Sequence, residues 1–113
     1  MPVIIYHNPR CSKSRATLAL LEQHGIQPRI IEYLKDAPSA DEIRALLKKL
    51  KLGARDLVRK GEDVYKDLKL AEASDDKLIA AMAKHPILIE RPIVVNGAKA
   101  ALGRPPENVL DIL

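Results

Sequence analysis

The chain has 113 residues, 47% of them hydrophobic and 30% charged, and its only aromatic residues are three tyrosines. This length suits one domain around one core, and no apolar run approaches the roughly 20 residues of a membrane span. The formal net charge is +4, but 19 basic residues are interspersed with 15 acidic ones and few aromatics could stack on bases. We therefore expect neither nucleic-acid nor membrane binding.

The N-terminal third predicts a βαβ unit. Residues 3–6 form a continuous apolar run, which is typical of a buried strand of a parallel sheet. Residues 12–22 are predicted to be helical, with Gly25 as the residue that ends the helix. Residues 29–34 are rich in β-forming residues and should return as a strand parallel to the first.

A second helix is predicted to begin at a capping box formed by Ser39 and Glu42. Its apolar residues recur at helical spacing and form one stripe, and we expect the helix to end at Gly53. The residues of the stripe are Ile43, Leu46, Leu47 and Leu50.

The middle of the chain is less regular. Short helical stretches are expected at residues 55–59 and 65–68, and Ser74 is the predicted cap of a helix that runs to about Lys84. Pro86 disfavours helix in the residue before it and closes this element. The buried residues of this helix should be Leu78, Ala81 and Met82.

The C-terminal part predicts a β-hairpin followed by a short helix. Residues 93–95 and 98–100 should pair through a type I′ turn, since Asn96-Gly97 is the dipeptide that this turn prefers. Pro105-Pro106 should begin the helix. Its inward residues should be Val109, Ile112 and Leu113.

The element order is therefore βαβ, helices, ββα, which predicts an α/β fold with a mixed sheet. We expect a single domain over residues 1–113. The helices of about residues 39–85 are predicted to be an insertion between the second strand and the C-terminal hairpin.

Cys11 is the only cysteine, and it lies between the first strand and the helix that follows. A helix N-terminus favours negative charge, and Arg10, Lys13 and Arg15 lie within four residues, so the position favours a reactive thiolate. The competing interpretation is a small buried hydrophobe. One cysteine cannot form an internal disulfide, and no secretory signal is apparent, so we expect a cytoplasmic protein.

Three arginines lie at the boundaries of predicted elements rather than within helices: Arg59, Arg91 and Arg104. Each alone is explained by a surface charge. If they converge on the helix N-terminus at Cys11, they would suit a tetrahedral oxyanion, because guanidinium groups bind its oxygens in pairs. The thiolate would then face the central atom of the anion.

His7 either tunes the thiol, binds the turn or simply ends a strand, and the sequence leaves these alternatives open. Ser14 either caps the helix or reaches the thiolate or anion. No metal site is expected, because one cysteine and three separated histidines lack the spacing of zinc ligands.

Four segments of this chain resemble the glutaredoxin-coupled bacterial arsenate reductases: residues 6–15, 57–60, 86–95 and 103–106. The resemblance covers essentially the whole chain and implies a thioredoxin-like fold with a helical insertion. The residues around Cys11 are more basic than those of dedicated resistance enzymes. In this respect the chain is more similar to the chromosomal relatives.

The resemblance implies that Cys11 attacks arsenate, or a similar oxyanion, and forms a covalent adduct. The arginines around the oxyanion would be Arg59, Arg91 and Arg104. The supporting residues would be His7, which influences the thiol, and Pro92, which matches the cis-proline of thioredoxin-like folds. Glutathione would be a co-substrate that attacks the adduct, glutaredoxin would reduce the resulting mixed disulfide, and no cofactor would stay bound.

The solitary cysteine agrees with this scheme. Reduction of arsenate takes two electrons, and thiols supply them by forming a disulfide, so the second thiol must come from outside the chain. Ser14 stands where related regulators carry the second cysteine of a redox switch. Two alternatives remain: a glutathione-linked thiol oxidoreductase that acts on protein mixed disulfides, and a non-catalytic module of the RNA-polymerase-binding type.

Overall fold

A computed structural model describes residues 3–113, and within it the chain forms two compact units. The sheet unit comprises the chain up to residue 36 together with residues 91–113, and the helical unit comprises residues 37–90. The predicted insertion of about residues 39–85 lies inside the helical unit. The prediction of a single domain stays a prediction.

The sheet unit is built on four strands: β1 (Val3–Tyr6), β2 (Arg29–Ile31), β3 (Ile93–Asn96) and β4 (Lys99–Leu102). Their order in the sheet is β2-β1-β3-β4. β1 runs parallel to β2 and antiparallel to β3, and β3 pairs antiparallel with β4. The predicted βαβ…ββα mixed sheet is confirmed.

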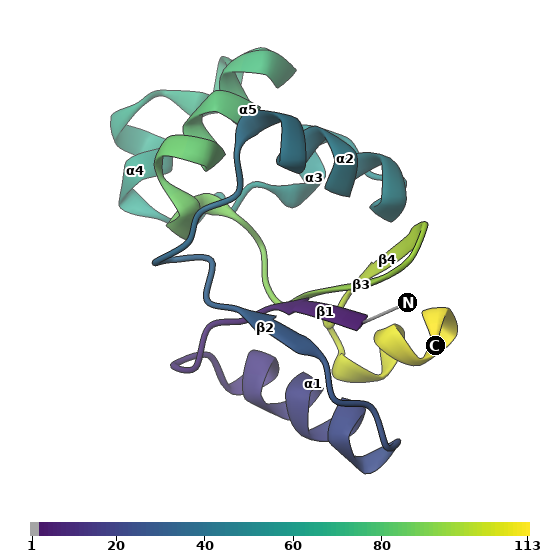
Figure 1. Ribbon diagram of the computed structural model, residues 1–113. Helices are drawn as coiled ribbons and strands as arrows, with labels where there is room; N and C mark the ends of the chain where they lie inside the picture. Colours follow the sequence, from purple (N-terminus) through teal and green to yellow (C-terminus); the bar gives the residue numbers. More distant parts are fainter. Residues whose placement is uncertain (1–2) are drawn as a thin grey trace. The chain divides into compact units, whose positions relative to one another are not determined.

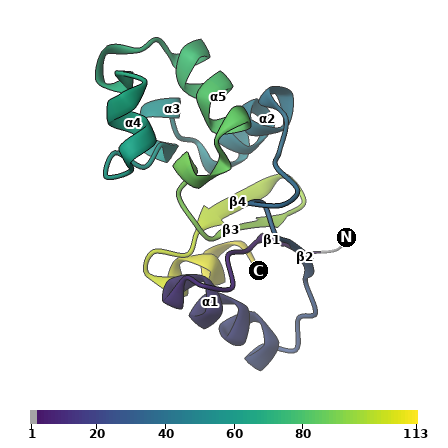
Figure 2. The same cartoon turned by 90° about the vertical axis from the view of Figure 1, so that its left-hand side faces the viewer.

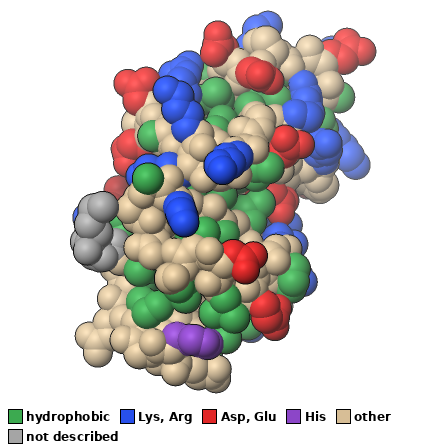
Figure 3. All heavy atoms as spheres, turned by 90° about the vertical axis from the view of Figure 1, so that its right-hand side faces the viewer, with side chains coloured by type: hydrophobic (Ala, Val, Ile, Leu, Met, Phe, Trp, Pro, Cys, Tyr) green, Lys and Arg blue, Asp and Glu red, His purple; other side chains and the backbone are tan. Residues whose placement is uncertain are grey.

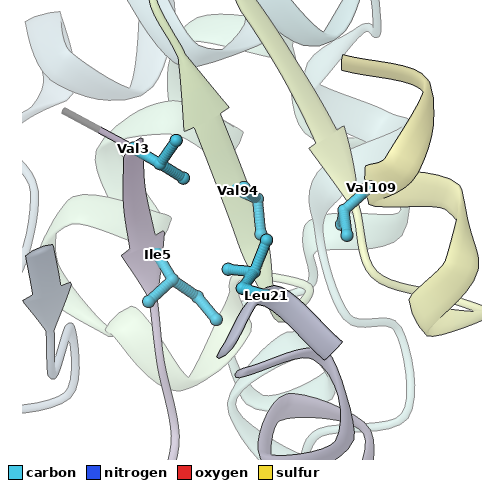
Figure 4. Packing of buried hydrophobic residues seen from close by; sticks show 5 residues of the cluster. All are labelled: Val3, Ile5, Leu21, Val94 and Val109. Atoms are coloured by element: carbon cyan, nitrogen blue, oxygen red, sulfur yellow. The ribbon is translucent and has the colours of Figure 1, made fainter. Parts of the chain in front are cut away.

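Two helices cover one face of this sheet: α1 (Ser12–Gln23) and the C-terminal 3₁₀ helix η3 (Pro106–Ile112), which is yellow in Figure 1. Figure 2 shows both on the same side of the strands. The core of the unit lies between these layers. Figure 4 shows its residues, which are Val3 and Ile5 of β1, Val94 of β3, Leu21 of α1 and Val109 of η3.

Both ends of α1 were predicted closely, whereas the position of Leu113, the residue after η3, was not. The helix α1 ends at Gln23, and Gly25 follows with a positive φ of 74°. Val109 of η3 is buried, but Leu113 is exposed, so its predicted inward position is wrong. Residues three apart share a face in a 3₁₀ helix, which keeps Ile112 beside Val109 and leaves Leu113 outside.

The hairpin is shifted by one residue from the prediction. Asn96 pairs with Lys99 in the ladder, so the two-residue loop is Gly97-Ala98 rather than Asn96-Gly97. A type I′ turn needs positive φ at both central residues, but only Gly97 has one, at 63°. Asn96 stays in the strand, where its side-chain amide donates to the carbonyl oxygen of Ile112 at 2.6 Å.

The helical unit contains short helices that follow one another closely. They are α2 (Ala40–Leu50), α3 (Ala54–Leu57), α4 (Asp63–Asp67), η1 (Leu70–Glu72), α5 (Asp75–Lys84) and η2 (Pro86–Leu88). The helix α5 packs against α2 and α3, and it buries Leu78, Ala81 and Met82 as predicted. Ser74 caps it by accepting a hydrogen bond from the amide of Lys77.

The start of α2 was predicted correctly, but its end was not. The Ser39 hydroxyl accepts from the Glu42 amide at 3.1 Å, and the Glu42 carboxylate accepts from the Ser39 amide at 3.2 Å. The helix ends at Leu50 because Lys51 adopts the left-handed conformation, with φ 59°. Gly53 instead precedes α3, and its amide donates to Asp56.

Charges of both signs are mixed over the face of the molecule drawn in Figure 3. Among residues 3–113, no helix is long and apolar enough to cross a membrane. The same residues contain no group of three or more histidine, cysteine or acidic side chains that could hold a metal ion.

Candidate active site at one end of the sheet

Strand register brings four chain segments to one end of the sheet, which we call the site end. Tyr6, the last residue of β1, pairs with Ile31 of β2 and with Ile93 of β3. Ile93 in turn pairs with Leu102, the last residue of β4. The residues after β1, β2 and β4 and those before β3 therefore lie at this end, and they include Cys11, Arg91 and Arg104.

The turn that leads from β1 to α1 is folded by Asn8. The backbone carbonyl of Asn8 accepts from the Cys11 amide at 3.0 Å, and its side-chain oxygen accepts from the Arg10 amide at 3.0 Å. This role of Asn8 was not predicted from the sequence. The Asn8-Pro9 dipeptide is a recognisable turn signal, because an asparagine side chain often accepts a hydrogen bond from the backbone amide two residues further on.

Cys11 is the residue that immediately precedes the first turn of α1. Its backbone is extended, with φ −92° and ψ 123°, and its carbonyl accepts the Arg15 amide at 3.0 Å. The thiol is free and partly exposed, and it does not cap the helix. The first amides of a helix lack partners within it, so a partly exposed sulfur here can meet a dissolved anion beside unpaired donors. The interpretation of Cys11 as a fully buried hydrophobe is wrong.

The three cations near Cys11 are placed differently. Arg10 and Lys13 have exposed side chains. The guanidinium of Arg15 donates through Nη1 to the carbonyl oxygen of Pro9 at 2.8 Å, so this side chain clamps the turn.

His7 and Ser14 form a buried pair beneath the turn. The Nδ1 atom of His7 lies 2.7 Å from the Ser14 hydroxyl oxygen, which also accepts from the Asn8 amide at 3.0 Å. The Ser14 hydroxyl thus joins the His7 ring to the backbone of the turn. Burial lowers the pKa of His7; Glu32 acts against this shift and Arg15 adds to it, so the fold favours the neutral ring.

Arg91 and Arg104 lie side by side where β3 begins and β4 ends. The Nε atom of Arg104 donates to the backbone carbonyl of Arg91 at 2.8 Å. Within residues 3–113, the Nε atom of Arg91 is buried without a hydrogen-bond partner. Buried donors nearly always have an acceptor, so this one is suited to an anionic ligand.

Gly103 packs closely against Pro92 and against α1 at the same end of the sheet. The Gly103 amide donates to the Pro92 carbonyl at 2.9 Å. A Cβ atom at Gly103 would lie 2.7 Å from Cγ of Pro92 and would collide with the side chain of Thr17 in α1. Both X-Pro bonds here, Arg91–Pro92 and Arg104–Pro105, are cis.

Arg59 belongs to the helical unit and is held there by acidic partners. Its amide donates to the Leu88 carbonyl at 2.6 Å. Its guanidinium lies 2.9 Å from a carboxylate oxygen of Glu62 and 3.5 Å from one of Glu90. These glutamates were not foreseen from the sequence. The place of Arg59 in an oxyanion site stays a prediction.

The sheet order and the helices define this protein as a thioredoxin-like α/β protein with one cysteine at the N-terminus of α1. The chain belongs to the ArsC family, whose sequence profile matches residues 6–112. Relatives with similar sequences match this chain over its whole length or nearly so. An arsenate reductase of Haemophilus influenzae is 53% identical over all of both chains, and the uncharacterized protein YfgD of Escherichia coli is 53% identical over 98% of this chain and 96% of that protein.

Solved structures agree with this family assignment. The arsenate reductase from Vibrio cholerae has a TM-score of 0.96 and 56% identity, over 100% of this chain and 98% of that one. A putative arsenate reductase from Yersinia pestis has a TM-score of 0.92 and 56% identity, over 97% and 99% of the two chains. The thioredoxin-like fold implied by the sequence is confirmed.

Proposed function

We propose that this protein is an arsenate reductase in which Cys11 is the nucleophile, glutathione supplies the second thiol and glutaredoxin regenerates the enzyme. The proposal rests on one observation, which is the arrangement of residues at the site end of the sheet. A partly exposed lone cysteine at a helix N-terminus lies at the same end as two adjacent arginines, Arg91 and Arg104. Full-length relatives named arsenate reductase support it.

The first step is attack of the Cys11 thiolate on arsenate. A sulfur–arsenic bond forms, an arsenic–oxygen bond breaks, and the departing oxygen takes protons and leaves as water. The negative oxygens would be held by the amides at the start of α1 and by the arginine side chains. The buried Nε atom of Arg91 is a donor for one of them. We assign a further contact with the anion to Arg104, whereas the contact of Arg59 stays a prediction from the sequence.

The second step is attack of the glutathione thiolate on the sulfur of Cys11. A disulfide forms and the sulfur–arsenic bond breaks. Its electron pair stays on arsenic, which leaves as arsenite while the two sulfur atoms are oxidised. Glutaredoxin then attacks the glutathione sulfur and frees Cys11. The reducing cytoplasm is the compartment that this chemistry requires.

Coupled oxidation of NADPH tests the proposal. The assay contains glutathione, glutathione reductase and glutaredoxin, with and without arsenate, and Cys11→Ser is the control variant. We expect arsenate-dependent oxidation by the wild-type protein alone. Oxidation by neither protein would refute the proposal. When a protein–glutathione mixed disulfide is added, its reduction by the wild-type protein but not by Cys11→Ser, at the same rate with and without arsenate, would instead favour the glutathione-linked thiol oxidoreductase.

A further inference from the structure

We propose that a pocket beside Cys11 binds the γ-glutamyl end of glutathione, an assignment that rests on the proposed function above. The pocket has a volume of about 200 Å³. Residues 7–10 form one wall, and Glu32, Leu34 and Lys35 form the other. All of them belong to the sheet unit.

The position of the pocket follows from the two parallel strands. The His7 amide donates to the Ile31 carbonyl at 2.8 Å, so the chain after β1 runs beside the chain after β2. Ligands of parallel sheets bind beyond the carboxyl ends of the strands, where these two walls lie. The first wall leads directly into Cys11, the next residue of the chain. A molecule anchored in this pocket is therefore bound beside the nucleophile.

The charges of the pocket match an amino acid rather than a simple anion. Its walls carry two cations, Arg10 and Lys35, and one carboxylate, Glu32. Lys35 and Glu32 are paired only loosely, at 3.9 Å, and their side chains are 83% and 46% exposed. An exposed pair at this distance contributes little to stability, so both groups are available to a ligand.

Glutathione has two different ends, and the pocket distinguishes between them. The γ-glutamyl end carries an ammonium and a carboxylate on one carbon atom, which suits a neighbouring anion and cation. The glycine end carries a carboxylate alone and would face the like charge of Glu32. Pro9 and Leu34 offer apolar contact to the methylene groups of the γ-glutamyl chain.

The size of the pocket supports the same assignment. Pockets that enclose a drug-sized molecule usually exceed about 300 Å³. A pocket of about 200 Å³ therefore holds one end of the tripeptide and leaves its cysteine outside. This arrangement is what attack on Cys11 requires, since the thiol of glutathione must stay free to reach the adduct.

Binding of S-methylated peptides to the full chain, followed by NMR titration, tests the assignment without any chemistry at sulfur. S-methylglutathione is the reference ligand. We expect S-methyl-γ-glutamylcysteine to retain most of the affinity and S-methylcysteinylglycine to lose about tenfold, because only the latter lacks the amino-acid end. Glu32→Gln and Lys35→Gln should each weaken S-methylglutathione binding about threefold to fivefold.

The control variant is Asp36→Asn, which removes an exposed carboxylate next to Lys35 that does not line the pocket. It should bind S-methylglutathione like the wild type. Equal affinity for the two truncated peptides would overturn the assignment, and so would unchanged binding in both pocket variants or no saturable binding at millimolar concentrations. The titration uses neither arsenate nor glutaredoxin, so its failure is distinct from a failure of the proposed activity.

Discussion

His7 illustrates how a few local contacts fix the state of one residue. Only 7% of its surface is exposed, and the Ser14 hydroxyl contacts its Nδ1 atom. Burial holds the pKa of His7 below its ordinary value of 6.5. The neutral ring therefore adds no positive charge beside Cys11, and the negative charge of a thiolate or an arsenate must be met by the helix N-terminus and the arginines.

The lowered pKa of His7 predicts a pH dependence of stability. As pH falls below 6.5, the unfolded chain binds a proton that the folded protein resists, so the free energy of unfolding decreases until the pH passes below the folded pKa. Above pH 6.5 the ring is deprotonated in both states, so the free energy of unfolding no longer changes with pH through His7. Urea unfolding between about pH 5 and pH 8 should show a component of at most about 1.4 kcal/mol per pH unit that His7→Gln lacks. Parallel pH profiles of the two proteins would contradict it.

Arg91 is the residue whose removal should affect arsenate binding most directly. Its buried Nε atom has no partner within residues 3–113, so the Arg91→Ala variant loses a donor without breaking a hydrogen bond of that atom. A hydrogen bond to a charged ligand contributes about 1.5–3 kcal/mol, which corresponds to a KM for arsenate that is roughly 10 to 100 times higher. Steady-state kinetics measure the change, and circular dichroism checks the fold.

The matched control for this prediction is Arg29→Ala. Arg29 is exposed and lies at the start of β2, at the opposite end of the sheet from Arg91. The KM for arsenate should be unchanged in this variant. An equal increase in both variants would attribute the effect to net charge rather than to a contact at the site.

At the scale of elements, the junction between α1 and the ends of β3 and β4 depends on the absence of a side chain at Gly103. In Gly103→Ala the new Cβ atom would press on Pro92, which precedes β3, and on Thr17 of α1. Overpacking of this kind costs about 1–3 kcal/mol in the free energy of unfolding. In Gly61→Ala the Cβ atom would meet nothing within 4 Å, so this variant is the control and should be close to neutral. Equal stabilities in chemical denaturation would contradict the prediction.

Elements whose signals are local could be predicted from the sequence, and those decided by distant contacts could not. The capping box of Ser39 and Glu42 lies within four residues, and it starts α2 as expected. The hairpin loop lies one residue later than predicted because the side chain of Asn96 bonds to Ile112, sixteen residues away, and stays in the strand. The end of α2 was missed for a different reason, because Lys51 takes a left-handed conformation that lysine seldom adopts.

The same distinction holds for the candidate site. The place of Cys11 between β1 and α1 follows from element order alone and was predicted. The contact between Arg104 and Arg91 depends on the register of β3 and β4, which element order does not determine. Nor does the sequence show that Glu90 faces Arg59, because the two are far apart in the chain.

At the scale of the whole chain, the presence of a single cysteine constrains the stoichiometry of the reaction. With Cys11 as the only protein thiol, one turnover must end with glutathione covalently attached to it. We therefore expect that arsenate and about one equivalent of glutathione, without glutaredoxin, yield one arsenite and one glutathionylated chain. Intact-protein mass spectrometry measures the adduct, and chromatography of arsenic species measures the arsenite.

Addition of glutaredoxin should then remove the adduct and restore the thiol for a second turnover. Cys11→Ser should give neither arsenite nor adduct, because it lacks the sulfur that bonds first to arsenic and then to glutathione. Arsenite produced without a glutathionylated intermediate would contradict the scheme, since the second oxidised sulfur would then have to lie elsewhere. No other residue of this chain has a thiol, so the adduct on Cys11 is the only protein disulfide through which the two electrons can pass.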